Sequence, residues 1–179
     1  MAEDYCNYLW ACSGLYITIN LSAQDLENPS FGDYVRELLA NYGVPTTLIV
    51  FEVTENALVD RVKASKQLQA LREQGHRIAV DDFGTGYSSL SYVNELPLDI
   101  LKIDRSFLDL KKMLTDDALW RHVAQMAHAL NLTVIAEGVE HPAQAEELSR
   151  AGVQFAQGWL YSKDFAAATL ARHFFRLRS

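Results

Sequence analysis

The sequence predicts an α/β fold with a parallel, barrel-type sheet of about six strand–helix units. Short apolar segments rich in β-branched residues alternate with segments whose apolar residues recur at helical spacing. Most of the apolar segments also end in polar residues, as strands do when their carboxyl ends form a binding face. The chain has 179 residues, 49% hydrophobic and 22% charged, so we expect a single globular domain over residues 1–179.

The first two units share a pattern of strand, helix and stop. Residues 15–22 alternate β-branched and aromatic residues, and the helix that follows is expected to end at Gly43. Residues 48–51 form the second expected strand, and the next helix is expected to end at Gly75. The apolar faces of these helices comprise Tyr34, Val35, Leu38, Leu39, Tyr42, Leu58, Val62, Leu68 and Leu71.

The third and fourth expected strands are residues 77–80 and 97–101. The third strand leads to Asp81 and Asp82 and then to a short helical segment that ends near Leu96. The fourth strand leads to Lys102, and an amphipathic helix follows it. The apolar residues of that helix are Leu119, Val123, Met126, Ala127 and Leu130.

The last two expected strands are residues 132–136 and 153–156. Pro142 is well placed to begin the helix after the first of them, because proline suits the first turn of a helix. The chain is expected to finish with a helix whose apolar residues are Leu170, Phe174 and Phe175.

An incomplete TIM-type (β/α) barrel would gather polar residues from several strands at one rim, because all strand carboxyl ends lie at the same face. These residues are Asn20, Glu52, Glu55, Asp81, Asp82, Lys102, Glu137 and Gln157. An open, doubly wound sheet is the alternative. However, Gly84-Thr85-Gly86 lacks the third glycine of the phosphate-binding fingerprint that such a sheet can carry.

Asp81 and Asp82 stand together at the end of a strand, where two like charges repel each other unless a cation lies between them. Oxygen ligands without Cys or His favour Mg²⁺ or Mn²⁺. Asp81 could bridge two such ions and support attack of water on a phosphodiester. Alternatively, one aspartate caps the next helix and the other is solvated.

Lys102 would orient or polarise the attacking water in this arrangement, and Glu137 could bind the second ion or take the proton. The alternative for Lys102 is simple neutralisation of its acidic neighbours. Glu140 either supports the site or stabilises the first turn of the following helix.

The overall charge limits the possible partners. The net charge of −7 argues against a nucleic-acid polymer but allows a small phosphate ligand held through metal ions. The acidic start, residues 1–5, does not resemble a signal peptide, and no apolar run approaches the roughly 18 residues of a membrane helix. We therefore expect no membrane segment and a cytoplasmic protein.

Six motifs follow one another between about residue 15 and residue 163. They are Asn20-Leu21-Ser22, Glu52-Val53-Thr54-Glu55, Asp81-Asp82-Phe83-Gly84-Thr85-Gly86-Tyr87-Ser88-Ser89-Leu90, Leu101-Lys102-Ile103-Asp104-Arg105-Ser106-Phe107, Glu137-Gly138-Val139-Glu140 and Gln157-Gly158-Trp159-Leu160. In this order they resemble the motifs of the EAL-domain family of cyclic di-GMP phosphodiesterases.

The resemblance implies Mg²⁺- or Mn²⁺-dependent hydrolysis of cyclic di-GMP to its linear dinucleotide, on a barrel that often dimerises. It implies that Asn20, Glu52 and Asp81 bind the first metal ion. The second ion would be bound by Asp81 and Asp82, with Glu137 as a further ligand or as the general base.

The remaining roles also follow from the resemblance. Lys102 would hold the nucleophilic water and Gln157 would help to position the site. Glu55 would anchor the loop from Asp82 to Ser89, which in this family links the metal site to the dimer contact.

The sequence departs from the family pattern in two places. It lacks the Glu-Ala-Leu motif, which in the family precedes the strand of Asn20, and Asp164 stands where the family usually has proline. About six units instead of the usual eight would leave an open barrel edge. We therefore expect a homo-oligomer, or a cover formed by residues 4–12 or by a partner chain.

Two alternatives to an enzyme stay open: a cyclic di-GMP-binding or protein-interaction module, and a fragment of a longer protein.

Overall fold

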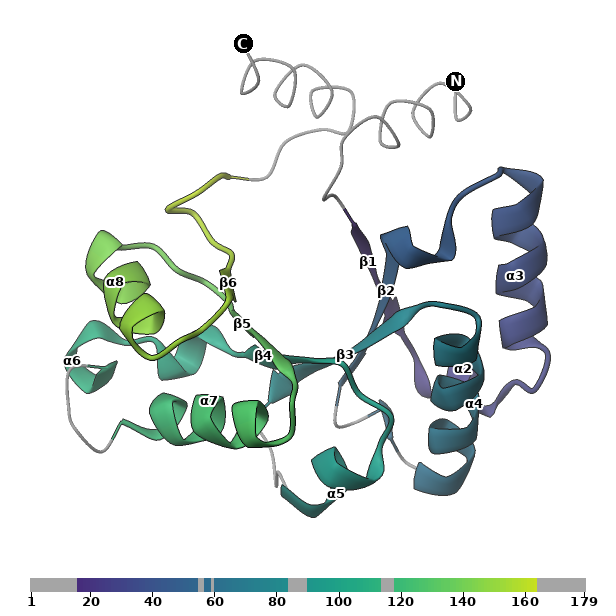
Figure 1. Ribbon diagram of the computed structural model, residues 1–179, viewed down its shortest axis with the longest axis horizontal. Helices are drawn as coiled ribbons and strands as arrows, with labels where there is room; N and C mark the ends of the chain where they lie inside the picture. The colour runs from purple at the N-terminus through teal and green to yellow at the C-terminus, as the bar shows by residue number, and fades with distance from the viewer. Residues whose placement is uncertain (1–15, 55–56, 59, 84–89, 114–117, 164–179) are drawn as a thin grey trace, which may run out of the picture.

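The computed structural model describes residues 16–54, 57–58, 60–83, 90–113 and 118–163. Within this part of the chain, six parallel strands form one sheet in the order β1-β2-β3-β4-β5-β6. The strands are Ile17–Leu21 (β1), Ile49–Thr54 (β2), Arg77–Phe83 (β3), Ile100–Ile103 (β4), Thr133–Ala136 (β5) and Phe155–Ala156 (β6). They form an open arc with β1 and β6 at its two ends (Figure 1). The predicted incomplete parallel barrel is confirmed.

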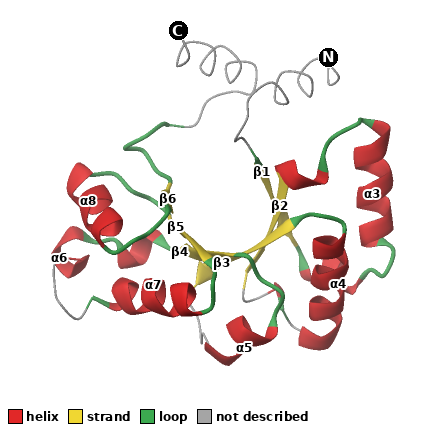
Figure 2. Cartoon of the chain, viewed as in Figure 1, coloured by secondary structure: helices red, strands yellow, loops and turns green. Residues whose placement is uncertain are grey.

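The helices lie on the outer side of this arc (Figure 2). They are Ala23–Glu27 (α2), Phe31–Asn41 (α3), Arg61–Glu73 (α4), Leu90–Glu95 (α5), Leu110–Met113 (α6), Leu119–Ala129 (α7) and Pro142–Arg150 (α8), with the short 3₁₀ turns Thr46–Leu48 (η1) and Arg105–Phe107 (η3). Right-handed crossovers through helices are the usual way to join neighbouring parallel strands. All strand carboxyl ends therefore meet at one rim.

Side-chain alternation divides the residues of β2 to β5 between two hydrophobic clusters. The larger cluster lies between the sheet and the helices, and it includes Phe51, Val80, Leu101, Val134 and the helical residues Leu68, Leu71 and Trp120. A smaller cluster on the other face of the sheet consists of Val50, Ala79, Ile100 and Ile135, one from each of the strands β2 to β5. We call these four residues the inner cluster.

Three local features differ from the sequence expectation. Helix α2 was not predicted, although Ser22 begins it in a capping box with Asp25. The sequence Asn28-Pro29-Ser30 predicts a cap for the next helix, but the Ser30 side chain makes no capping hydrogen bond at the start of α3. The fourth strand begins at Ile100, because the Asp99 carboxylate binds Arg72 and the Ile78 N–H just ahead of it.

The two ends of the arc are exposed. Ile17 and Ile19 of β1 keep 43% and 42% of their surface accessible, and Phe155 of β6 is also exposed. The predicted final helix and the segment 4–12, which was expected to cover this edge, lie outside the described residues. Among the helices described, none has the length and apolar character that crossing a membrane requires.

Candidate metal centre

Charged side chains lie directly above the inner cluster, at the carboxyl ends of four strands. Each one follows an inner-cluster residue by two positions, so the two-residue period of a strand turns it to the same face. They are Glu52, Asp81, Lys102 and Glu137. The register of the parallel strands thus gathers one cation and three acidic groups at the rim.

Lys102 is at the centre of this group. Its Nζ lies 2.9 Å from Glu52 Oε1, 3.1 Å from Asp81 Oδ1 and 2.7 Å from Glu137 Oε1. Only 4% of the Lys102 surface is exposed. The three donors of an ammonium group match these three carboxylates, which lie on β2, on β3 and just after β5.

The protonation of the pair Lys102 and Glu137 reflects this packing. Burial acts to lower the pKa of Lys102, but the hydrogen bonds to Glu137 and Glu52 and the charge of Asp81 outweigh it and raise that pKa. Burial also raises the pKa of Glu137, with repulsion from Asp81 and Glu52 in the same direction and Lys102 opposing it. Lys102 therefore stays charged, while Glu137 holds a proton more readily than an ordinary carboxylate.

A β-bulge in β3 sets the directions of the neighbouring Asp81 and Asp82 side chains. Val80 pairs with Leu101 and Phe83 with Ile103, so β3 uses one residue more than β4 over this interval. Asp82 takes up the bulge with a φ of +53°, and its N–H donates to Asp81 Oδ1 at 2.9 Å. In a regular strand, neighbouring side chains would point to opposite faces. The bulge lets both carboxylates reach the same site.

Asp81 and Asp82 both lie within β3, and residues 84–89, which precede α5, lie outside the described residues. Burial raises the pKa of Asp82, and the charges of Asp81 and Asp104 raise it further.

Asp104 is not among the site residues predicted from the sequence. Its pKa is lowered because hydrogen bonds from Ser106 and from the Arg105 backbone outweigh the effect of burial. The Asp-Arg-Ser sequence, in which the aspartate caps η3, was the available signal.

Three carboxylates form a donor set that fits a hard divalent cation. One oxygen each from Asp81, Asp82 and Glu137 lies within 4.8 Å of the others. All of these donors are anionic oxygens, the ligand type of Mg²⁺ and Mn²⁺, whereas zinc sites usually include Cys or His. The expected cluster of acidic oxygens is therefore present.

The other predicted site residues differ in their position relative to the rim and in their exposure to solvent. Asn20 pairs in register with Glu52 across β1 and β2, although it is exposed. Gln157 follows β6, and its Nε2 donates to Glu137 Oε1. Glu140 is exposed and precedes the residue that caps α8, so it is outside the first helical turn. Glu55, the loop 84–89 and Asp164 lie outside the described residues.

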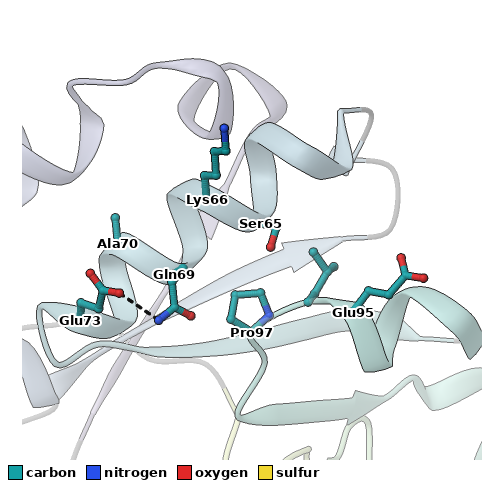
Figure 3. A pocket seen from close by; sticks show the side chains of 8 residues that line it. Ser65, Lys66, Gln69, Ala70, Glu73, Glu95 and Pro97 are labelled. Carbon is teal, nitrogen blue, oxygen red and sulfur yellow. Dashed lines mark hydrogen bonds between the residues drawn. The ribbon is translucent and has the colours of Figure 1, made fainter.

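A separate cavity of about 480 Å³ lies on the helix side of the sheet, between α4 and the connection from α5 to β4. Figure 3 shows it between Gln69 and Glu73 of α4 and Pro97, with Glu95 at one end. None of the predicted site residues lines it. It is therefore distinct from the acidic rim.

Comparison with known proteins identifies related chains. The family model described as EAL domain matches residues 10–164. The "Probable cyclic di-GMP phosphodiesterase PdeB" of Escherichia coli (strain K12) is 40% identical over 161 residues, which cover 90% of this chain and 31% of the relative. The "Cyclic di-GMP phosphodiesterase NbdA" of Pseudomonas aeruginosa is 40% identical over 158 residues, covering 87% of this chain and 20% of the relative. The chain thus spans less than a third of the length of these relatives.

Solved structures show the same fold. The "PaMucR Phosphodiesterase, c-di-GMP complex" superimposes with a TM-score of 0.82 at 36% identity and covers 94% of this chain and 76% of that one. The "EAL Enzyme Bd1971 - cAMP and cyclic-di-GMP bound form" gives a TM-score of 0.86 at 32% identity and covers 96% and 47%. Both were solved with cyclic di-GMP bound.

Proposed function

The chain belongs to the EAL domain family, and from this premise we propose that it is a metal-dependent phosphodiesterase domain that hydrolyses cyclic di-GMP to the linear dinucleotide. The observation that carries the proposal is the contact of buried Lys102 with Glu52, Asp81 and Glu137 at one rim. The printed functions of PdeB and NbdA support the choice of substrate.

Asp81 and Asp82 would hold the Mg²⁺ or Mn²⁺ ions, with Asn20 and Glu52 completing the ligand set and the Glu137 carboxylate beside them. When bound, such ions supply Lewis-acid activation of water and neutralise charge on the phosphodiester. The number of these acidic residues and the fixed orientation of their carboxylates would determine where the ions lie, and therefore where the phosphate can bind.

Lys102 orients the attacking water in this proposal. Because its pKa is raised, it remains a hydrogen-bond donor and does not act as a base. Glu137 Oε1 contacts both Lys102 Nζ and Gln157 Nε2, so we assign Glu137 Oε2 as the atom that takes the proton from water. The raised pKa of Glu137 suits this task, because a stronger base accepts the proton more readily.

The test is turnover of cyclic di-GMP by the purified chain with Mn²⁺, with the linear dinucleotide measured by chromatography. Wild-type chain should give product, and Glu137→Gln should lose on the order of 10²- to 10⁴-fold in kcat. Glu146→Gln is the matched control, because Glu146 is exposed on α8 and pairs with Arg150 away from the rim. Equal rates for Glu137→Gln and wild type would refute the assignment.

A cyclic di-GMP-binding module is the second candidate, and the solved relatives that hold cyclic di-GMP support it. In that case the remaining rim residues would hold the dinucleotide without hydrolysing it. Calorimetric binding of cyclic di-GMP without product would favour the module. Product formation would exclude it as the sole function.

The proposal includes a second copy of the chain at the open edge of the arc. Exposed Ile17 and Ile19 on β1 support it, because unpaired edge strands with apolar side chains tend to associate. Light scattering after size exclusion should give the mass of a dimer or larger oligomer. A well-behaved monomer would refute this part and leave the proposed chemistry untouched.

A further inference from the structure

The loop after β6 (residues 157–163) packs directly on the loop after β5 (residues 137–141). Gly158 has a φ of +151°, and a Cβ atom there would lie 2.9 Å from the carbonyl carbon of Gly138 and closer still to the backbone nitrogen and oxygen of Val139. Backbone atoms cannot rotate away as the end of a side chain can. A side chain at position 158 would therefore push the two loops apart.

Backbone hydrogen bonds join the same two loops. The Gln157 N–H donates to Ala136 O at 2.8 Å, and the Val139 N–H donates to Gln157 O at 3.0 Å. Beyond the glycine, the Leu160 N–H donates to Val139 O at 3.0 Å. The register between the loops is thus fixed on both sides of Gly158.

The loop after β5 is also enclosed from its other side. A Cβ atom at Gly138 would lie 2.5 Å from Arg105 Cβ, so η3 packs against this loop as closely as the loop after β6 does. The Glu137 N–H donates to Ile103 O at 3.0 Å. Glu137 is consequently held between the ends of β4 and β6.

From these contacts we infer that Gly158 is a positioning residue, which sets Glu137 and Gln157 against each other by allowing the two loops to meet. It acts through the backbone of Val139 and touches no reacting group. The Gln157 Nε2 hydrogen bond to Glu137 Oε1 is the contact that this packing maintains. The inference rests on the proposed function, since it concerns how that site is held in place.

The competing explanation is that Gly158 only avoids backbone strain. Gly152 separates the two explanations, because it also has a positive φ, +77°, but a Cβ there would meet His128 Cε1 at 3.6 Å, an ordinary contact. Gly152→Ala therefore carries the conformational cost without the clash. It is the matched control for Gly158→Ala.

The experiment measures three quantities in both variants and in wild type. The first is the position of the NMR signals of the Gln157 side-chain amide in the metal-free protein, which are assigned by their loss in Gln157→Glu. The second is the thermal unfolding midpoint, and the third is kcat and KM for cyclic di-GMP with Mn²⁺. In Gly158→Ala the amide signals should move to the positions of a free glutamine. The kcat should fall on the order of 100-fold with KM changed less than about threefold. Gly152→Ala should keep the wild-type amide signals and a kcat within about twofold of wild type.

Wild-type amide signals or a wild-type kcat in Gly158→Ala would overturn the inference. If the wild-type chain gives no turnover, the proposed function fails, and the amide signals still decide the role of Gly158. If Gly158→Ala does not fold, amide exchange in the wild-type chain decides instead. Slow exchange at Val139 and Leu160 supports the packed loops, and fast exchange at both refutes them.

Discussion

Lys102 Nζ lies 2.7 Å from Glu137 Oε1, and the same nitrogen also contacts Glu52 and Asp81. One ammonium group therefore contacts three acidic side chains from other parts of the sheet and offsets part of their negative charge. Without Lys102 or a bound cation, these carboxylates would repel each other in a largely buried site. The stability of the metal-free chain should depend strongly on this one residue.

Lys102→Met should lower the free energy of unfolding by about 3–5 kcal/mol in the absence of metal, because it leaves buried carboxylates without their cation. Adding Mn²⁺ should restore part of the loss, since binding to the folded state stabilises it. Urea denaturation with EDTA and with Mn²⁺ measures both effects. Lys66→Met, on the exposed face of α4, is the control and should change the value by about 0.5 kcal/mol or less. A Lys102→Met chain as stable as this control would contradict the prediction.

Asp82→Gly should be more stable than Asp82→Ala by about 1–2 kcal/mol, because alanine is strained at the φ of +53° that the bulge requires. Urea denaturation of the two variants measures the difference. Glu37 is exposed in the interior of α3, so there the order should reverse, with Glu37→Ala more stable than Glu37→Gly by about 0.5–1 kcal/mol. The same order at both positions would show that the bulge carries no strain.

His76 should make the chain less stable as the pH falls. Only 3% of its surface is exposed, and burial lowers its pKa, although the nearby backbone of Ile49 and Thr46 acts against that effect. The unfolded chain then binds the proton more readily, so stability falls as the pH drops below the ordinary histidine value of about 6.5.

Unfolding free energies of wild type and His76→Leu, measured between pH 7.5 and 5 in steps of about half a unit, test this. The wild-type chain should lose up to about 1.4 kcal/mol per pH unit relative to the variant. Exposed His122 on α7 is the control, and His122→Leu should follow the wild-type profile. Parallel profiles for wild type and His76→Leu would contradict the prediction.

Strand periodicity was sufficient to predict most of the rim. Glu52 and Lys102 lie in strands with regular two-residue alternation, so their common face follows once the strands are recognised. The family motifs place Glu137 and Gln157 at the ends of the next strands. Their individual roles stay predictions.

The bulge and the packing of the loops could not be predicted in this way. In Val80-Asp81-Asp82-Phe83 the alternation assigns the two aspartates to opposite faces, and only the pairing with β4 reveals the extra residue. Gly158 reads as an ordinary turn glycine, because its neighbours Gly138 and Val139 are close only in the folded chain. By contrast, the Ser22–Asp25 capping box of α2 is a local signal that the sequence does contain.

Anomalous diffraction from crystals soaked in Mn²⁺ is the most direct test that acidic groups from separate strands bind divalent cations at one rim. We expect a peak within coordination distance of Asp81 and Asp82, next to Glu137, and its loss in Asp81→Asn crystals. Asp33→Asn, on the exposed face of α3, should keep the peak. A wild-type rim with no peak, or manganese bound only elsewhere on the chain, would contradict the account.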